Sequence, residues 1–525
     1  AAGSESKRGS VIAMRPGETD RRKVRRQRLL LLAASLLAVS RDVGAFVFPA
    51  QSHVERPAAR SSLIRNSPRN DAALISSSRL LLQKNMQRGG DDTCLVGDNV
   101  VDQCGVINTG TEPQNSAAIN LAKCICGAGS FALPHVFLEE GVLGGTLAIM
   151  LCGSLATITM QSLSDSKLKA GNAEVSQGRE PIASYVQLAR TALGEPAAKV
   201  VFFLTLFASL GVCSTYLVFI GSTLESMSCD ATADNIVRWL APDVDEVSWE
   251  MAAALVLFPL SLIRDYSVFA FTSTLGVIAV LGGIITTLAY GVLVNPGGGL
   301  SVAIDAVETL PLWPSSMADA FGGSFGTLCY LFAINFLCFP VMNSLKVPKD
   351  FDGAIEKAVI GVLVANIAFA VLALGFYGNE TQDIVLGNLE NGPWLSALKL
   401  LLCIDLLFTY PIVFSSGRQI LDNAIVGPDN ISGAGDEDES GLARAGIVAG
   451  GVGATFALAQ IGGFGVVANL VGGVAQGTLA FIVPPAIALA LMEEESENNK
   501  IAQYAVGSFG TVVVAAVTFF TLTSS

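Results

Sequence analysis

One short run of the sequence combines residues that interrupt a helix with groups that can bind a polar ligand. Residues 120–134 read NLAKCICGAGSFALP and lie in an apolar stretch. Gly127 and Gly129 weaken a helix, and Pro134 removes a backbone hydrogen bond. Unwinding here frees backbone N–H groups, and the N-terminus of the following half-helix favours an anion such as a carboxylate. Packing of small residues between membrane helices explains the same pattern equally well.

Two charged residues lie inside apolar stretches, Lys123 in this run and Asp405 in a later one. A charge at mid-membrane costs a few kcal/mol, so such residues tend to pair and to be functional. The alternative is that Lys123 snorkels toward one membrane surface and Asp405 caps a water-filled cavity. With only two histidines in the chain, a His-rich metal site is excluded. Asp405 also has no acidic partner in the apolar stretches, which argues against an intramembrane enzyme.

The elements that position these residues must cross a membrane. The chain has 525 residues, of which 51% are hydrophobic and 15% charged, and its mean hydropathy is +0.55. About a quarter of the residues in ordinary soluble domains are charged, so this chain has too little charge for a soluble surface. An all-α polytopic membrane protein is predicted. The apolar body carries excess acidic charge, so nucleic-acid binding is not expected.

Eleven apolar segments are long enough to be read as membrane helices. They lie near residues 116–137, 142–163, 197–224, 249–264, 267–293, 319–341, 355–377, 394–416, 442–462, 465–491 and 502–522. With the N-terminus inside, the inside loops hold twelve Lys and Arg and the outside loops hold Arg238 and Lys399. Cytoplasmic-side loops carry the excess of basic residues, so this orientation is predicted.

Several segments together resemble one known family, the amino acid/auxin permeases. The run at 120–134 is similar to the family pattern NLxxxxxGAGxxALP. Further segments match the family in chain order, at 211–221, 259–264, 339–351, 375–378, 409–411 and 479–484. The resemblance covers about residues 115–522. It implies a LeuT-like fold of five-plus-five inverted repeats with an eleventh helix appended, and it implies that the first and sixth spans are broken.

The resemblance also implies a substrate site at the two breaks. The sixth-span break is expected around residues 333–336, where the central glycine that eases unwinding is missing. Tyr216 in the third span is a candidate contact, although aromatic packing explains it as well. The expected substrate-binding residues are Gly127, Ala128, Gly129, Ser130, Tyr216, Asn335 and Phe336.

Ion coupling is expected between the first and eighth spans, which flank the sodium site of sodium-coupled relatives in the implied fold. The expected residues are Asn120, Lys123, Asp405 and Thr409. Our hypothesis is that the Lys123 ammonium occupies or blocks the sodium position, so that H⁺ is the coupling ion or coupling is absent. Coupling to Na⁺ is the alternative. No cofactor and no resident metal are expected. His135, next to Pro134, could gate proton entry, or it could be passive.

The predicted function is secondary active transport of neutral amino acids by alternating access. The partners are a small-molecule amino acid and the lipid bilayer, and the oligomeric state is left open. A sensor with a transporter fold is the alternative from another class. The site segments add no charge that selects a basic or acidic side chain, except Lys123, which is assigned to coupling.

The N-terminal region differs from the rest of the chain. Residues 1–100 hold 17 Lys and Arg against 9 Asp and Glu. Residues 1–45, with Met14 as the natural start, have the basic and short apolar regions of a signal peptide. Residues 46–110 are Arg- and Ser-rich like a transit peptide. Together they resemble the bipartite presequence of algae with complex plastids, in which cleavage falls just before a Phe, here Phe46. The transporter domain is expected over 111–525.

This resemblance predicts that the protein lies in a plastid envelope, and a vacuolar or plasma membrane is the alternative. A glycosylation sequon at Asn379 lies in a predicted outside loop and separates these alternatives. Only a protein that passes the secretory pathway with this loop in the lumen can be glycosylated there.

Overall fold

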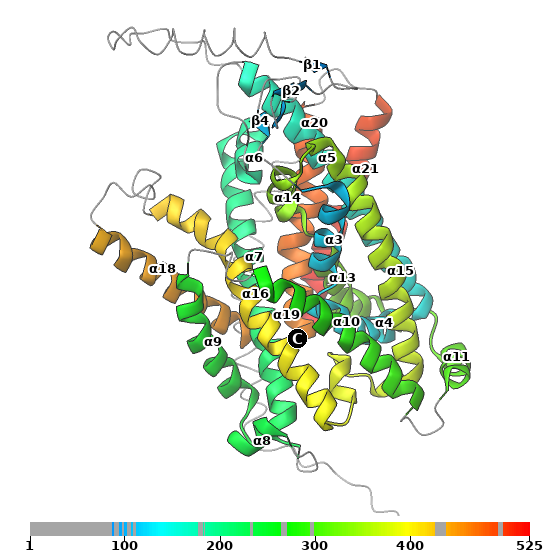
Figure 1. Cartoon of the computed structure of the whole chain (residues 1–525). Helices are drawn as coiled ribbons and strands as arrows, with labels where there is room; N and C mark the ends of the chain where they lie inside the picture. Colours follow the sequence, from blue (N-terminus) through cyan, green and yellow to red (C-terminus); the bar gives the residue numbers. More distant parts are fainter. Residues whose placement is uncertain are drawn as a thin grey trace, which may run out of the picture.

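The computed structural model of the chain describes residues 112–176, 182, 184–230, 235–263, 270–293, 299–425, 437–491 and 497–524, with four short strands before them (Figure 1). The strands are β1 (Gln87–Arg88), β2 (Cys94–Val96), β3 (Asn99–Val101) and β4 (Ile107–Asn108), paired antiparallel in chain order. The predicted signal peptide at 1–45 lies outside the described residues, as does the predicted transit segment apart from these strands.

The long helices follow the predicted spans. The first group is α3 (Gln114–Ile125), α4 (Leu133–Glu140), α5 (Val142–Ser176), α7 (Glu195–Ser228), α9 (Glu246–Leu262) and α10 (Ala270–Leu293). The second group is α13 (Phe325–Phe332), α14 (Cys338–Ser344), α15 (Phe351–Tyr377), α16 (Pro393–Ile425), α18 (Glu437–Ala459), α19 (Phe464–Leu470), α20 (Val483–Leu491) and α21 (Glu497–Ser524).

Short elements connect or interrupt these helices. The surface helices are α6 (Tyr185–Leu193), α8 (Ile236–Leu240), α11 (Leu300–Thr309) and α12 (Met317–Asp319). The 3₁₀ segments are η1 (Ala128–Ala132), η4 (Asn335–Leu337), η5 (Pro348–Asp350), η6 (Gly378–Glu380) and η7 (Val385–Asn388). The π-helical segments are η3 (Ala320–Ser324), η8 (Val471–Gln476) and η9 (Thr478–Ile482).

The all-helical membrane fold is confirmed, but the count of eleven spans is not. In the described part of the chain, eight helices are long and apolar enough to cross a membrane, or up to nine if α3 with η1 and α4 counts as one bent span. Every predicted span lies on helix, and the shortfall comes from short helices such as α9 and Arg444–Ala459. A helix of 17 residues such as α9 is about 26 Å long, slightly less than the hydrocarbon core.

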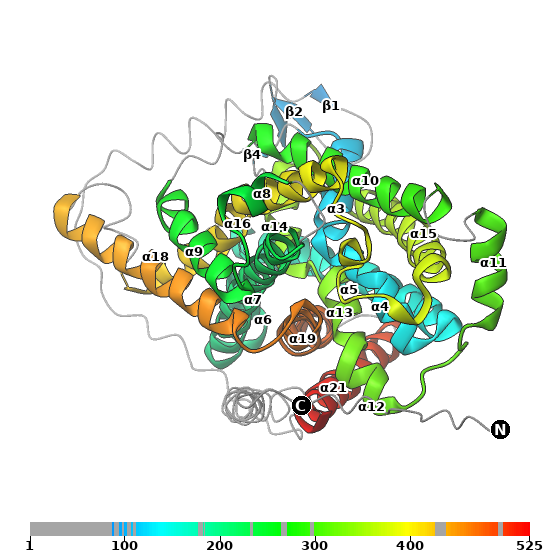
Figure 2. The same cartoon turned by 90° about the horizontal axis from the view of Figure 1, so that it is seen from below.

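Helices at equivalent positions in the two halves of the chain pack against each other. The second predicted span, α5, contacts α15, the seventh; α7 contacts α16; and α9 contacts α18. Figure 2 shows α9 beside α18 at one edge of the bundle and α11 at the opposite edge. Each pair joins spans that are five apart in chain order, which is the arrangement that two five-helix repeats require.

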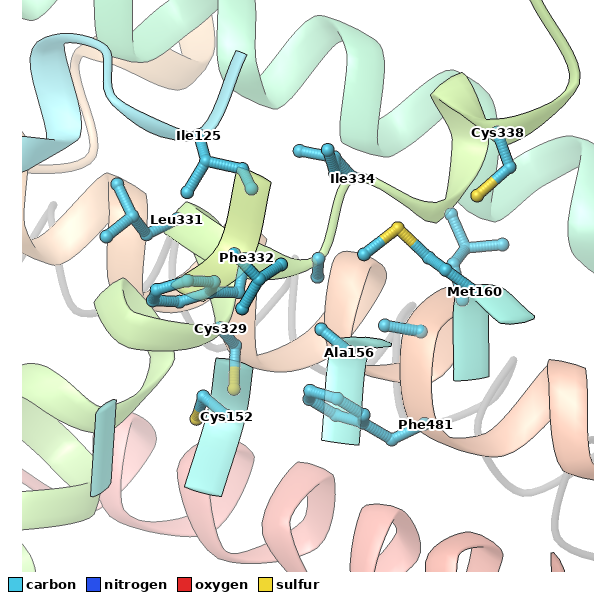
Figure 3. Close-up of a cluster of buried hydrophobic side chains, with 14 of the residues drawn as sticks. Ile125, Cys152, Ala156, Met160, Cys329, Leu331, Phe332, Ile334, Cys338 and Phe481 are labelled. Carbon is cyan, nitrogen blue, oxygen red and sulfur yellow. The ribbon is translucent and has the colours of Figure 1, made fainter. Parts of the chain in front are cut away.

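The two broken spans meet in the core. Ile125, the last residue of α3, belongs to the same buried cluster as Leu331 and Ile334, and Figure 3 shows these three side chains close together. The same cluster includes Met160 of α5 and Phe481 of η9. Apolar packing of this kind holds the ends of the half-helices where the backbone itself is interrupted.

Candidate functional site

The first span is broken where the sequence predicts. Helix α3 ends at Ile125, and the backbone leaves the helix at Cys126 and Gly127 before η1 begins. The segments on either side of this break are bent by 45°. Pro134 lies in the first turn of α4, where its missing N–H costs nothing because first-turn donors have no partner inside the helix. Gly127 therefore lies at the break, and Pro134 lies in the first turn of α4, which follows it.

The two glycines of this break have opposite surroundings. A methyl group added to Gly127 would meet nothing within 4 Å, whereas one added to Gly129 would lie 3.2 Å from Leu331 and 3.3 Å from Tyr330. Ser130 is fully buried and its hydroxyl donates to the Cys126 sulfur at 3.7 Å. The break is thus open beside Gly127 and tightly packed on α13 beside Gly129.

The sixth predicted span is also broken, at Ala333 and Ile334 between α13 and η4. This lies inside the predicted range of 333–336 although no glycine is present there. The opposite end of α13 is bonded to another helix. Asn469 of α19 accepts a hydrogen bond from the Gly326 N–H at 2.6 Å and donates to the Gly322 carbonyl at 2.8 Å. These bonds take up backbone groups at the start of α13, so this end of the helix is fixed by a side chain from outside the span.

The side-chain oxygen of Asn335, at this second break, has no hydrogen-bond donor among the described residues. Its side chain is fully buried, and its Nδ2 donates to Thr159 Oγ1 at 3.2 Å. The Thr159 hydroxyl donates to the Ala156 carbonyl at 3.1 Å, so its oxygen is left to accept from Asn335. Among the described residues nothing donates to Asn335 Oδ1. A buried acceptor without a donor is costly, and a ligand N–H would satisfy it. Phe336, the next residue, is half-buried.

Lys123 and Asp405 are brought together by the fold. The two side chains interact electrostatically, although they are 282 positions apart in the chain. Asp405 is 7% exposed, and Lys123 is half-buried. The Thr409 hydroxyl donates to Asp405 Oδ1 at 3.5 Å. The carboxylate also lies directly on Gly276 of α10, because a Cβ there would collide with it. Lys123, Gly276 and Asp405 thus bring together the first, fifth and eighth predicted spans.

Tyr216 and Asn120 occupy different places relative to this pair. Tyr216 is half-buried in α7 and packs against the buried cluster that includes Tyr330. Asn120 is exposed, and its amide donates to Glu112 Oε2 at 3.3 Å. Glu112 in turn pairs with the end of α14, accepting from the Ser344 hydroxyl at 3.3 Å. Asn120 is thus part of a group of contacts in which Glu112, just before α3, bonds to Ser344 at the end of α14.

Three aromatic residues that the sequence did not mark as functional lie beside the first break, on the side of it that is predicted to face outward. Tyr330 packs on Gly129, and its hydroxyl pairs with Thr215 Oγ1 at 2.7 Å. Phe464 contacts Tyr330 with ring centroids 6.4 Å apart and Phe219 at 6.2 Å. All three are buried. Aromatic residues in apolar spans give no local signal, since packing is their usual role.

Neither of two cavities in the described part of the chain is lined by the residues of the breaks. The first, named the outer cavity after the predicted orientation, has a volume of about 360 Å³ and is lined by residues of α7, α9 and α16, by the segment 382–387 and by Phe464. The inner cavity, of about 280 Å³, lies between α5, α20 and α21. Phe464 forms part of the outer cavity wall and contacts Tyr330, so the outer cavity lies one aromatic layer from Gly129.

His135 ties α4 to the segment that follows α15. Its Nδ1 lies 3.0 Å from the Thr381 carbonyl, which can only accept, so Nδ1 donates. Its Nε2 lies 3.4 Å from Asp383 and 3.6 Å from Glu139. Both ring nitrogens thus face acceptors, an arrangement that favours the doubly protonated ring. In the described residues, no group of three or more His, Cys, Asp or Glu side chains could hold a metal ion.

Comparisons with known proteins identify the family of the chain. The sequence profile of the family described as "Transmembrane amino acid transporter protein" matches residues 113–524. "Amino acid transporter ANT1" of Arabidopsis thaliana is 24% identical over 71% of this chain and 83% of its own. "Putative sodium-coupled neutral amino acid transporter 11" of Rattus norvegicus is 23% identical over 78% of this chain and 84% of its own.

Among solved structures, that of MhsT in complex with L-phenylalanine is similar, with a TM-score of 0.43 and 13% identity over 77% of this chain and 98% of that chain. The family match extends over most of the chain, includes both broken spans and ends with α21. The protein belongs to the transmembrane amino acid transporter family.

Proposed function

We propose that the chain is a proton-coupled secondary transporter of neutral amino acids. The observation that carries this proposal is the pairing of Lys123 with Asp405 beside the first break. An ammonium group on the first span, facing the eighth, supplies a fixed positive charge where a bound cation would otherwise be placed. That charge repels a sodium ion, because like charges repel most strongly where little water screens them. Amino acid transport is then driven by a proton gradient and not by a sodium gradient.

The groups at the two breaks support an amino acid with a neutral side chain. A substrate carboxylate fits the N-terminus of the half-helix that begins at Ala128, next to the open space at Gly127. A substrate ammonium fits Asn335 Oδ1, the buried acceptor without a donor. Ser130, Tyr216 and Phe336 add hydroxyl and aromatic surface and no charge. With both charges of the zwitterion matched, no charge remains to select an ionised side chain.

Proton coupling follows from the position of Asp405. When Asp405 is ionised, its carboxylate holds the Lys123 ammonium. When Asp405 takes up a proton, that attraction is lost, and the ammonium becomes available to a substrate carboxylate at Gly127, four residues further along the chain. Binding of proton and substrate then favour each other by the reciprocity of linked equilibria. Rocking of the helix bundle around this site completes alternating access.

We also propose the plastid envelope as the location, on the presequence-like residues 1–110. The sequon offers a direct test, because Asn379 is exposed in η6 on the predicted outer side. We expect residues 1–110 fused to a fluorescent protein to enter the plastid of an alga with complex plastids, and the full chain to lack glycan at Asn379. Glycosidase-sensitive protein in a vacuolar or plasma membrane would contradict this location.

Uptake of radiolabelled neutral amino acids into liposomes that contain the purified chain tests the transport proposal. A pH gradient and a sodium gradient are imposed separately. Saturable uptake driven by the pH gradient alone is expected. Uptake driven by sodium would retain the transporter and remove the role of Lys123. Specific binding without uptake would favour an amino acid sensor instead.

A further inference from the structure

The outer cavity contains a buried charge that the transport mechanism does not use. Lys399 of α16 lines this cavity and is 1% exposed. Its Nζ donates to Asn391 Oδ1 at 2.7 Å and to Ser226 Oγ at 3.4 Å. Both acceptors are neutral, and no carboxylate among the described residues forms a salt bridge with Lys399. An ammonium has three donors, so one N–H of Lys399 is not used by these bonds.

The side-chain amide of Asn391 bonds to both Lys399 and an acidic residue, Asp230. Asn391 Nδ2 donates to Asp230 Oδ2 at 3.1 Å, while Asn391 Oδ1 accepts from Lys399. Asp230 therefore interacts with Lys399 across Asn391 rather than by direct contact. A buried cation without a contacting anion is destabilising, and a carboxylate that enters the cavity would relieve this.

The same cavity also carries negative charge. Glu246, the first residue of α9, and Asp383 both line it. Asp383 lies 3.4 Å from His135, so a positive ring already balances part of its charge. Glu246 lies in the electrostatic range of a second carboxylate, Glu250. Because Asp383 already faces the His135 ring, we assign the carboxylate of Glu246 as the counterpart for a ligand cation.

We propose that the outer cavity is a second binding site for a zwitterionic α-amino acid, with the carboxylate on Lys399 and the ammonium on Glu246. The volume of about 360 Å³ lies at the small end of the range for ligand pockets, about 300–1,000 Å³. Phe464 separates this site from Tyr330 and the first break. The site thus receives substrate on the outer side before the aromatic layer opens. The inference builds on the proposed transport function.

A protection assay tests this site independently of uptake. The Ser222→Cys variant places a thiol in the cavity wall without touching the partners of Lys399, and Cys229→Ser removes the exposed native thiol nearby. A membrane-impermeant methanethiosulfonate then labels position 222 in liposomes. L-Alanine, L-leucine and L-phenylalanine are the probes, with alaninamide, which lacks the carboxylate, and propionate, which lacks the ammonium, as matched compounds.

We expect the most effective of the three amino acids to slow labelling, and the two matched compounds to have little effect. Adding Lys399→Gln should raise the half-protecting concentration about tenfold, as the loss of one charge-assisted hydrogen bond predicts. Glu246→Gln should do the same if Lys399→Gln fails to fold. Lys357→Gln, on the inner side where Lys357 bonds to Gln114, is the control and should leave protection unchanged.

The central site must be separated from the outer one. In the Gly129→Val background, where Tyr330 and Leu331 leave no room for the added methyl groups, protection should persist although uptake is lost. Absence of protection in the parent variant, equal protection by alaninamide, or protection that survives both charge variants would overturn the outer site. Uptake without protection removes the outer site alone, and protection without uptake removes the transport proposal alone.

Discussion

The two broken spans reach the same geometry by different routes. The first is interrupted at Gly127, with a proline in the first turn of the half-helix that follows. The second is interrupted at Ala333 and Ile334 without glycine, and Asn469 from α19 holds the start of its helix. The first span also carries Lys123 beside its break, whereas α13, η4 and α14 carry no charged residue. A glycine in the local sequence therefore explains the first break. The second break has no such residue and depends on contacts with other helices.

This difference suggests separate roles for the two spans. The glycines let the first break change conformation at low cost, because glycine populates backbone conformations that other residues avoid. At the second break Asn335 donates to Thr159 of α5, so a hydrogen bond between helices helps to hold this span. Substitutions at Gly129, Lys123, Asn469 and Gly127 can test this contrast, and their expected effects decrease in that order.

The largest effect is expected at Gly129. The Gly129→Val variant places methyl groups against Tyr330 and Leu331, which already lie within 3.3 Å of a Cβ at this position. Overpacking of this kind costs about 1–3 kcal/mol, and it falls on the contact between the two breaks. We expect uptake into liposomes to be abolished while the protein still purifies as a folded species. Normal uptake would show that this contact does not constrain the site.

Next in size is a change of coupling ion at Lys123. In the Lys123→Thr variant a small hydroxyl replaces the ammonium that faces Asp405, so the carboxylate becomes available to a sodium ion. We expect uptake to gain sodium dependence, by about tenfold if one charge-assisted contact is recovered. The comparison is uptake with sodium or choline outside. Unchanged ion dependence would remove Lys123 from the coupling mechanism. Lys357→Thr is the matched control.

A smaller effect, on stability, is expected at the start of α13 in the second broken span. The Asn469→Ala variant leaves the Gly326 N–H without its acceptor, which costs about 1–3 kcal/mol for a buried group left unsatisfied, while the Gly322 carbonyl keeps the Thr521 hydroxyl as a donor. We expect a lower Tm in detergent. Asn366 of α15 is the control, because it is fully buried and neither polar atom of its side chain has a partner in the described residues. Asn366→Leu should leave Tm unchanged or raise it.

The smallest effect is expected at Gly127. A methyl group there meets open space, so Gly127→Ala does not clash with any described residue. Alanine favours helix over glycine by about 1 kcal/mol, which opposes the break by about a factor of five. We expect uptake to fall by that factor or less, in clear contrast to Gly129→Val. Equal loss in both variants would mean that backbone freedom, and not packing on Tyr330, limits the first break.

Much of the fold was predictable from local sequence. Hydropathy and low charge predict a helical membrane protein, and each predicted span lies on helix, although α9 and Arg444–Ala459 are too short to count as candidate spans. Gly127 marks the first break because a single residue type carries that signal. Asn335 was expected at the second break only through the family resemblance, and the roles proposed for the site residues remain predictions.

The sequence by itself determined which segments enter the membrane and where the first span breaks, because hydropathy and glycine act over a few neighbouring residues. Only the tertiary structure placed Asp405 beside Lys123 and on Gly276, left Asn335 Oδ1 without a donor, and separated Lys399 from Asp230 by Asn391. Each of these depends on side chains from different helices meeting in a low-dielectric interior. There a charge or an unpaired polar atom gains its significance from its neighbours in space rather than from its neighbours in the chain.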